Sequence, residues 1–398
     1  MKKKVCIVSG GLLPVPAVCG GAVETLAACI AEENAKTGDF NLQIITINDK
    51  GLAGIHLKHA RLLPVAIPGM VRLLDKLCYF YVAKIKKSWK ANFYRKYITQ
   101  KYYAEKLKKI LSENDYDLIV VENNMSLLSS VYKAIGQERY EKQCVYHMHS
   151  VLIDNLKMTE YLLKCRKIIA VSRCVVDTVK ETYPAFCNTD FSVVTNGIDY
   201  SQFDFALNQS KETLKKEYGI PQGKYVYLYC GRISEEKGVR ELVQAYVRMH
   251  NKDMVLVFAG ASYTGSNTMS PYEKELRLYI DKEKPVVIFL GYIDYEKIAE
   301  VYRLADCLII PSLAVEAGPL TSLEGAAMGL QVIAPAYGAV KEYLGEFALY
   351  FQNQYDLVQK MEHVYLNSKE IHSKQFPKEY FGSVAYYERF KNEIEGLL

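Results

Sequence analysis

Short apolar runs rich in β-branched residues alternate with longer stretches of helical periodicity along this chain. Such alternation predicts βαβ units, in which helices join parallel strands, so the fold class is predicted to be α/β. The runs that predict strands in the first half are Lys4–Ser9, Leu42–Ile47, Asp117–Glu122, Cys144–Met148, Lys167–Val171 and Phe191–Thr195. Those in the second half are Tyr225–Cys230, Met254–Ala259, Val286–Leu290, Asp306–Ile310 and Gln331–Ala334.

The strand pattern is interrupted once, at Asn196-Gly197-Ile198-Asp199 and the polar stretch that follows. Asn-Gly favours a turn, and no strand-like run returns until Tyr225. We therefore predict two Rossmann-like domains, over residues 1–200 and 201–376. Residues 377–398 predict an amphipathic helix that returns to the first domain.

Length and composition fit two ordinary globular domains. The chain has 398 residues, of which 50% are hydrophobic and 24% are charged, which excludes a disordered or fibrous protein. Its ten cysteines include no C-x-x-C pair and no cluster at zinc spacing. Neither a disulfide framework nor a metal site is indicated, and a reducing cytoplasm is expected.

The N-terminus superficially resembles a targeting segment, because three lysines precede an apolar run. Gly10, Gly11 and Pro14 interrupt that run too early for a continuous apolar helix, so we expect no targeting segment. An uncharged apolar stretch of about 18 residues is also missing from the sequence, so no spanning helix is predicted.

Positive charge is concentrated in one stretch. Twelve Lys or Arg lie between Met70 and Ile110 against Asp75 and Glu105 alone, although the net charge of the whole chain is only +5. Aromatic residues are interleaved with them: Tyr79, Phe80, Tyr81, Trp89, Phe93, Tyr94, Tyr97, Tyr102 and Tyr103. Residues 70–110 favour either a helical surface that contacts an anionic bilayer or a solvated face over a tyrosine-rich core. No nucleic-acid motif accompanies the charge, so nucleic acid is not expected as a partner.

Ligands of open α/β sheets bind beyond the carboxyl ends of the strands, so the loops there carry the candidate chemistry. Gly20-Gly21 follows the first strand and precedes a helix, which suits either a phosphate contact or a simple turn. The loop Gly231–Gly238 carries Arg232 and Lys237, two cations that can bind a diphosphate; the alternative is that Lys237 pairs with Glu235 or Glu236.

The loop after Asp306–Ile310 carries two carboxylates, Glu316 and Glu324, on either side of a Gly318-Pro319 turn. We expect Glu324 to lie on the helix that follows the turn. The helix N-terminus can hold phosphate, while the two carboxylates can accept hydrogen bonds from hydroxyl groups at opposite ends of an elongated ligand. A sugar at one end and a ribose at the other fit this arrangement.

Taken together, these motifs resemble the family 4 retaining glycosyltransferases of the GT-B fold, of the kind found in capsule or exopolysaccharide assembly. The resemblance rests on the Glu316–Glu324 spacing, on Gly-Arg-x-x-x-x-Lys-Gly at 231–238, on Gly20-Gly21 and on the Asn196-Gly197 hinge, and it covers nearly the whole chain. It implies two Rossmann-like domains that face each other across a cleft. The acceptor would bind to residues 1–200 and the sugar nucleotide to residues 201–376, with residues 377–398 packing back on the first domain.

The resemblance also assigns roles. Arg232 and Lys237 would bind the donor diphosphate and help it leave, Glu316 would contact the donor sugar, and Glu324 would contact the ribose. The residues implied in donor binding are Gly20, Gly21, Arg232, Lys237, Glu316, Ala317, Gly318, Leu320, Thr321 and Glu324. The family's commonest form has glycine three residues after the first glutamate, whereas this chain has Pro319, which offers no N–H and puts the identity of the donor sugar in question.

His149, after the strand Cys144–Met148, resembles the family's histidine near the reacting carbon, so the catalytic candidates are His149, Arg232, Lys237 and Glu316. A structural role is the alternative for His149, and it is favoured for His147. Further candidates that follow strands are Ser172, Asn196, Gly291 and Tyr292.

The expected activity is retaining transfer of a sugar from a nucleotide-diphosphate sugar, with a UDP- or GDP-sugar expected and no tightly bound cofactor or metal. The acceptor would be a saccharide, and the basic stretch 70–110 favours a lipid-linked one at the inner membrane face. Two alternatives remain open: a noncatalytic sugar-nucleotide-binding or surface-coat protein on the same fold, and a sugar-nucleotide epimerase.

Overall fold

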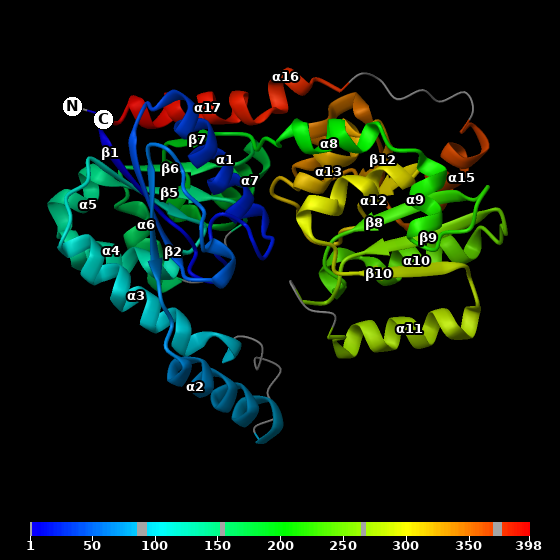
Figure 1. Cartoon of the computed structure of the whole chain (residues 1–398), viewed down its shortest axis with the longest axis horizontal. Helices are drawn as coiled ribbons and strands as arrows, with labels where there is room; N and C mark the ends of the chain where they lie inside the picture. The colour runs from blue at the N-terminus through cyan, green and yellow to red at the C-terminus, as the bar shows by residue number, and fades with distance from the viewer. Residues whose placement is uncertain (1, 86–93, 152–155, 264–267, 369–375) are drawn as a thin grey trace. The chain divides into compact units, whose positions relative to one another are not determined.

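The computed structural model describes residues 2–85, 94–151, 156–263, 268–368 and 376–398. The chain forms two compact units. The first comprises Met1–Val171, Val179–Val194 and Tyr387–Leu398, and the second comprises Ser172–Thr178 and Thr195–Tyr386. Each unit is built around a parallel sheet, which Figure 1 shows with the helices that cover it.

The sheet of the first unit has the strand order β3-β2-β1-β4-β5-β6-β7, and every neighbouring pair is parallel. Its strands are β1 (Lys4–Val8), β2 (Asn41–Ile47), β3 (Ala60–Val65), β4 (Leu118–Glu122), β5 (Cys144–Met148), β6 (Lys167–Ala170) and β7 (Phe191–Val193). The helices along this part of the chain are α1 (Ala22–Thr37), α2 (Gly69–Phe80), α3 (Tyr97–Ser112), α4 (Leu128–Ile135), α5 (Gln137–Gln143), α6 (Leu156–Leu163) and α7 (Arg173–Thr182).

The sheet of the second unit is also parallel throughout, in the order β10-β9-β8-β11-β12-β13. Its strands are β8 (Tyr225–Cys230), β9 (Met254–Ala259), β10 (Val287–Gly291), β11 (Cys307–Ile309), β12 (Gln331–Pro335) and β13 (Ala348–Phe351). Its helices are α8 (Tyr200–Leu207), α9 (Lys211–Glu217), α10 (Val239–Arg248), α11 (Pro271–Glu283), α12 (Ile298–Leu304), α13 (Leu320–Ala327), α14 (Val340–Leu344), α15 (Gln354–Leu366) and α16 (Lys378–Phe381).

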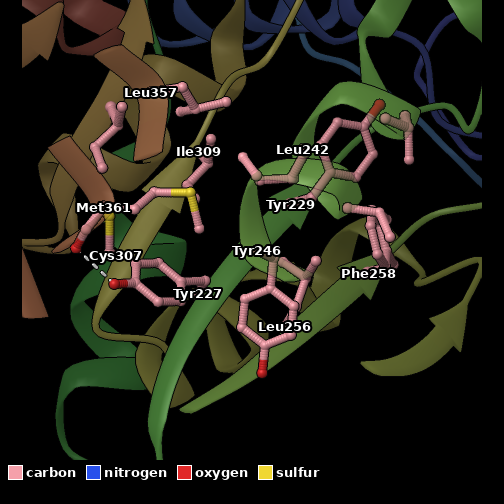
Figure 2. Packing of buried hydrophobic residues seen from close by; sticks show 14 of the residues in the cluster. Tyr227, Tyr229, Leu242, Tyr246, Leu256, Phe258, Cys307, Ile309, Leu357 and Met361 are labelled. Atoms are coloured by element: carbon pink, nitrogen blue, oxygen red, sulfur yellow. Dashed lines mark hydrogen bonds between the residues drawn. The ribbon is translucent and has the colours of Figure 1, made fainter. Parts of the chain in front are cut away.

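Successive side chains along the strands of the second unit point to opposite faces of its sheet. Tyr227, Leu256 and Ile309 point into a core that α10, α11 and α15 close, as Figure 2 shows for many of its members. In that core the Tyr227 hydroxyl donates to the Met361 carbonyl at 2.7 Å, which satisfies its buried polar group. Leu308 faces the other side, where its side chain lies directly under Gly325 of α13.

The strands and two parallel sheets predicted from the sequence are confirmed, with boundary shifts of a residue or two. Two strands were not predicted, β3 and β13, and both lie at an edge of a sheet. Pro64 sits in β3, where an edge position tolerates the missing N–H. Edge strands need not be apolar on both faces, which is why their pattern is weaker.

The single C-terminal helix predicted over residues 377–398 is wrong in one respect. The segment forms two helices, α16 and then α17 (Ser383–Glu395). Gly382 interrupts it in an extended conformation, and Ile198 pairs with Gly382 in an isolated parallel bridge. Beyond the break, the Tyr387 hydroxyl donates to Asp39 Oδ2 at 2.9 Å and also lies 3.1 Å from Asn34 Oδ1 of α1. The end of α17 therefore belongs to the first unit, as expected for the returning helix.

Each sheet reverses its strand order next to the first strand of its unit. In the first unit β1 lies between β2 and β4, and in the second unit β8 lies between β9 and β11. Loops that leave such a reversal in opposite directions create a crevice at the carboxyl ends of the strands. The functional candidates should therefore lie after β1 and β4 and after β8 and β11.

Among the residues that the structure describes, no helix combines the length and apolar character needed to cross a membrane.

Candidate active site

The loop after β8 in the second unit presents two cations. Arg232 is exposed and lies 3.5 Å from Glu236, whereas Lys237 is more shielded and its Nζ lies 2.6 Å from Glu316 Oε1. Lys237 therefore pairs with Glu316 and not with Glu235 or Glu236, which was the alternative. Gly238 ends the loop with φ of 63°, and a Cβ there would lie 1.9 Å from the Pro311 carbonyl oxygen. Glycine is needed at that point because the two loops touch through their backbones.

Glu316 is held between the two loops. Its carboxylate accepts hydrogen bonds from Lys237 and from the Ser312 hydroxyl. The N–H groups of Leu313 and Ala314 both donate to the Glu236 carbonyl, at 3.0 and 3.1 Å. The loops after β8 and β11 thus form one hydrogen-bonded structure at the point where the strand order reverses.

The turn before α13 is fixed by Asn196. The Asn196 side-chain amide donates to the Gly318 carbonyl at 2.7 Å, and its backbone N–H donates to the Tyr343 hydroxyl at 2.9 Å. A Cβ on Gly318 would lie 2.7 Å from that hydroxyl. Pro319 is the N-cap residue of α13, and no side chain caps the helix. The first-turn amides of this helix, including those of Leu320 and Thr321, are therefore oriented as an anion-binding helix N-terminus.

Glu324 lies on α13, as expected, and its carboxylate is buried. The Tyr302 hydroxyl donates to Glu324 Oε2 at 2.6 Å, and the Tyr295 hydroxyl lies 3.4 Å from Oε1. Burial raises the pKa of Glu324 to about 7, although the two hydroxyl groups act in the opposite direction. A ligand with hydroxyl groups that donate to this carboxylate would favour its ionised form.

The remaining candidates of the second unit differ in burial and in their contacts. Gly291 ends β10 with φ of 75°, and its carbonyl accepts from Gly260 at 2.7 Å, so it makes a close turn at the same edge of the sheet. Tyr292 follows it and is partly exposed, and Ala317 lies in the loop between Glu316 and Gly318. Ser172 is buried, and its hydroxyl accepts from the Val175 N–H at 3.2 Å, which is a helix-capping contact.

In the first unit, Gly20 and Gly21 have φ of 74° and 114°, and Gly21 is the N-cap of α1. A Cβ on Gly21 would lie 2.3 Å from a carboxylate oxygen of Glu24, which folds back over the loop. Glu24 is itself buried, and burial raises its pKa, with a further contribution from the nearby charge of Glu122. The loop after β1 therefore lies close to the carboxyl end of β4.

His149 follows β5 and contacts that end of β4. Its Nε2 lies 2.7 Å from Glu122 Oε2, and Nδ1 of His147 lies 3.1 Å from the same oxygen. Burial would raise the pKa of Glu122, but the two imidazoles lower it to about 2. Burial and the neighbouring His147 lower the pKa of His149 to about 4, against the effect of Glu122, so this ring is neutral near pH 7.

Glu122, His147 and His149 also form a group that could hold a metal ion, because one ligand atom from each lies within 4.8 Å of the others. The far nitrogens, His147 Nε2 and His149 Nδ1, are buried and have no hydrogen-bond partner among the described residues. Histidines bound to a metal normally donate their second N–H to a carboxylate or carbonyl. That second contact is missing here, so the donor set does not fit a metal centre.

The structure thus brings Arg232, Lys237 and Glu316 together in the second unit and places His149 and the Gly20-Gly21 loop near the end of β4 in the first, whereas Ser172 only caps a helix. Sequence reasoning missed several of the groups that support these residues, among them Glu122, Tyr302 and the Glu236 carbonyl. The position of Glu122 at the end of a predicted strand was a usable signal, since side chains at strand ends meet at one edge of a parallel sheet. Tyr302 and the Glu236 carbonyl gave no such signal, because their contacts depend on the tertiary packing.

Solved structures with the same fold span the whole chain. Sucrose-phosphate synthase from Thermosynechococcus elongatus superimposes with a TM-score of 0.72 at 17% identity, over 100% of this chain and 99% of that one. HepE from Anabaena, in complex with UDP and glucose, also gives a TM-score of 0.72 at 17% identity, over 99% of this chain and 100% of that one. Two Rossmann-like units with these sheets define the protein as a member of the GT-B fold class.

Sequence comparisons agree with the GT-B fold class and identify a family within it. Residues 69–202 match the model of Glycosyltransferase Family 4, and residues 210–377 match that of Glycosyl transferases group 1. Spore coat protein SA of Bacillus subtilis is 24% identical over 86% of this chain and 83% of that protein. The lipopolysaccharide 1,2-N-acetylglucosaminetransferase of Salmonella typhimurium is 27% identical over 59% of this chain and 58% of that protein.

The two family models together cover most of the chain, so the protein belongs to the family 4, group 1 glycosyltransferases. It is a retaining glycosyltransferase that uses a nucleotide sugar as donor.

Proposed function

We propose that the protein transfers a sugar from a UDP- or GDP-sugar to a lipid-linked saccharide at the cytoplasmic face of a membrane, in the synthesis of a surface polysaccharide or glycoconjugate. In this proposal Arg232, Lys237 and the N-terminus of α13 bind the diphosphate, Glu316 contacts the donor sugar, and Glu324 accepts hydrogen bonds from the ribose. His149 of the first unit is assigned a hydrogen bond to a hydroxyl group of the transferred sugar. No metal is assigned to the reaction.

The charges of the second unit support the donor assignment. Two cations and the uncapped amides of α13 lie on loops that leave the same reversal of strand order. Charge-assisted hydrogen bonds to a diphosphate contribute about 1.5–3 kcal/mol each, and they also stabilise the negative charge that develops on the leaving group. The HepE structure, which contains UDP, makes UDP-sugars the first donors to test.

The observation that carries the acceptor assignment is the exposed apolar face of α2. Asp75 is the buried residue of this helix, and it accepts from the N–H groups of Ile98 and Thr99 at 2.7 and 3.0 Å, which attaches α2 to the start of α3. Figure 1 shows α2 extending beyond α3 at the periphery of the first unit. The stripe of apolar side chains that is left exposed comprises Met70, Leu73, Leu74, Leu77 and Phe80, and continues into Tyr81 and Ile85.

In α2 the buried residue is the acidic Asp75, whereas the leucines are exposed, which is the reverse of the usual pattern of a surface helix. Arg72, Lys76 and Lys84 are exposed beside the apolar stripe, which suits a helix that lies in the interface of an anionic bilayer. This assigns the membrane contact to α2 within the basic stretch 70–110, of which residues 86–93 lie outside the described residues. A transferase on a membrane surface would meet acceptors carried on lipids, and the Salmonella relative is named for lipopolysaccharide.

Vesicle cosedimentation tests the membrane contact. We expect the wild-type protein to bind vesicles that contain anionic phosphatidylglycerol, to bind neutral phosphatidylcholine vesicles more weakly, and to be released by salt. Leu73→Glu combined with Leu77→Glu should reduce binding by about tenfold or more, since two charges would enter the apolar interface. Leu278→Glu combined with Leu366→Glu is the matched control, because both leucines are exposed on helices of the second unit.

The same variants test the acceptor. Transfer to a saccharide on a lipid in anionic vesicles should fall in the α2 double variant, while hydrolysis of the donor nucleotide sugar should stay at the wild-type rate. Equal vesicle binding by the wild-type protein and the α2 variant would contradict the membrane assignment. An equal rate of transfer to lipid-linked and water-soluble acceptors by both proteins would contradict the lipid-linked acceptor.

A further inference from the structure

Glu122 is a buried carboxylate to which the family-based assignment gives no role. Its side chain is 1% exposed, and it contacts two imidazoles whose side chains are 0% and 4% exposed, those of His147 and His149. A buried charge is retained only where hydrogen bonds compensate its lost hydration. Both imidazole nitrogens that face this carboxylate must therefore carry hydrogen, because an ionised carboxylate can only accept.

We propose that Glu122 is a positioning residue for the transfer reaction, which fixes His149 in the Nε2–H tautomer and so presents its Nδ1 lone pair to a substrate hydroxyl group. Nδ1 of His149 is buried and has no partner among the described residues, so it is a hydrogen-bond acceptor that the protein does not satisfy. The substrate role rests on the proposed function of His149, whereas the tautomer does not.

The end of β4 holds His149 at two points. Asn123, next to Glu122, has φ of 48°, and its side-chain oxygen accepts from the His149 N–H at 2.9 Å and from the Ser150 hydroxyl at 3.0 Å. Asn123 therefore fixes the backbone of His149 while Glu122 fixes its ring. A role confined to stability would not require the ring nitrogen opposite the carboxylate to remain unpaired.

His147 has a different part in the cluster. Its Nδ1 donates to Glu122, its ring lies 4.1 Å from that of His149 between centroids, and Phe390 packs near it at 5.8 Å. It supplies the second N–H that an isolated buried carboxylate needs. We assign it to the stability of the Glu122 charge and not to contact with substrate.

Nitrogen-15 NMR of histidine-labelled protein tests the tautomer without any variant. In the wild-type protein near neutral pH, His149 should show a protonated Nε2 and an unprotonated Nδ1. The opposite tautomer, or an equal mixture of the two, would overturn the proposal. Metal analysis of the same sample is part of the test, since a stoichiometric metal on this cluster would also overturn it.

Glu122→Gln tests the link to the reaction, because an amide can donate as well as accept and no longer imposes one tautomer. We expect a mixed His149 tautomer and a fall of about 10- to 100-fold in kcat for hydrolysis of UDP-glucose or GDP-mannose, whichever the protein accepts, with little change in KM. His147→Asn is the control: its side-chain N–H replaces Nδ1–H, so it should keep both the tautomer and the rate.

The tautomer of His149 and the kcat of Glu122→Gln test two separate parts of the proposal. An unchanged His149 tautomer in Glu122→Gln would overturn the positioning role itself. A changed tautomer with an unchanged kcat would leave Glu122 orienting the ring but would remove the substrate contact, which is the part that rests on the proposed function of His149.

Discussion

Lys237 Nζ lies 2.6 Å from Glu316 Oε1, so an ion pair reinforces the backbone hydrogen bonds that join the loop after β8 to the loop after β11. The Lys237 ammonium therefore has a partner within the protein. A diphosphate that binds Lys237 must compete with the Glu316 carboxylate, and this competition has a measurable consequence.

Glu316→Gln should bind UDP or GDP more tightly than the wild-type protein does, by about 3- to 10-fold, because a negative charge next to the phosphate site is removed. Sugar transfer should fall in the same variant, since the carboxylate proposed to contact the donor sugar is lost. Isothermal titration calorimetry with the nucleoside diphosphate gives the affinity. Weaker binding by this variant would mean that Glu316 does not compete with phosphate.

Arg232→Ala should separate binding from stability. Arg232 is 58% exposed and its partner Glu236 is 47% exposed, and exposed ion pairs contribute about 0–1 kcal/mol, so the melting temperature without ligand should barely change. The stabilisation by a donor nucleotide should be largely lost. Arg240→Ala is the matched control, because Arg240 forms a similar exposed pair with Glu275. Equal loss of donor stabilisation in both variants would point to a general charge effect.

Glu324 should make donor binding depend on pH. Because burial raises the pKa of Glu324 to about 7, much of it is protonated below pH 7, whereas ribose hydroxyl groups donate to the ionised form. Binding then releases a proton, so the affinity for a nucleotide sugar should rise by up to about tenfold per pH unit below pH 7 and level off above it. Glu324→Gln should remove this dependence. A flat profile for the wild-type protein would show that Glu324 does not contact the donor.

Gly238→Ala should be much more destabilising than a glycine substitution in an open turn. The alanine Cβ would meet the Pro311 carbonyl oxygen at 1.9 Å, in a backbone conformation with φ of 63°. Gly223 has φ of 71° with nothing within 4 Å, so Gly223→Ala carries only the conformational cost of about 1–2 kcal/mol. Melting temperatures of the two variants make the comparison. Similar values would mean that the loops after β8 and β11 can separate without loss.

The sequence predicted the elements that local pattern determines. Strands buried on both faces, such as β8 and β9, give continuous apolar runs, and the loops that follow them can be located from the strand ends. The edge strands β3 and β13 were missed because an edge position relaxes that pattern. The break at Gly382 was missed because a single glycine is tolerated in many helical patterns.

The site was predicted only in part, because its contacts join residues that are far apart in the sequence. The positions of Arg232, Lys237 and Glu316 follow from motif spacing, but the partners of these residues do not. Lys237 has two acidic neighbours in the sequence and pairs instead with a residue 79 positions away. The Glu122 contacts likewise join two strands that are adjacent in space and separate in sequence. Only strand order and register bring such groups together.

The central claim is that the second unit binds a nucleotide sugar through Arg232, Lys237 and Glu324, and a thermal-shift screen against UDP-, GDP-, ADP- and dTDP-sugars tests it most directly. A ligand at about 100 times its dissociation constant stabilises the folded protein by about 2.7 kcal/mol, a readily measured shift. We predict stabilisation by one nucleotide class, UDP or GDP, that is lost in both Arg232→Ala and Glu324→Ala. Stabilisation by none of them, or stabilisation that survives both substitutions, would contradict the account.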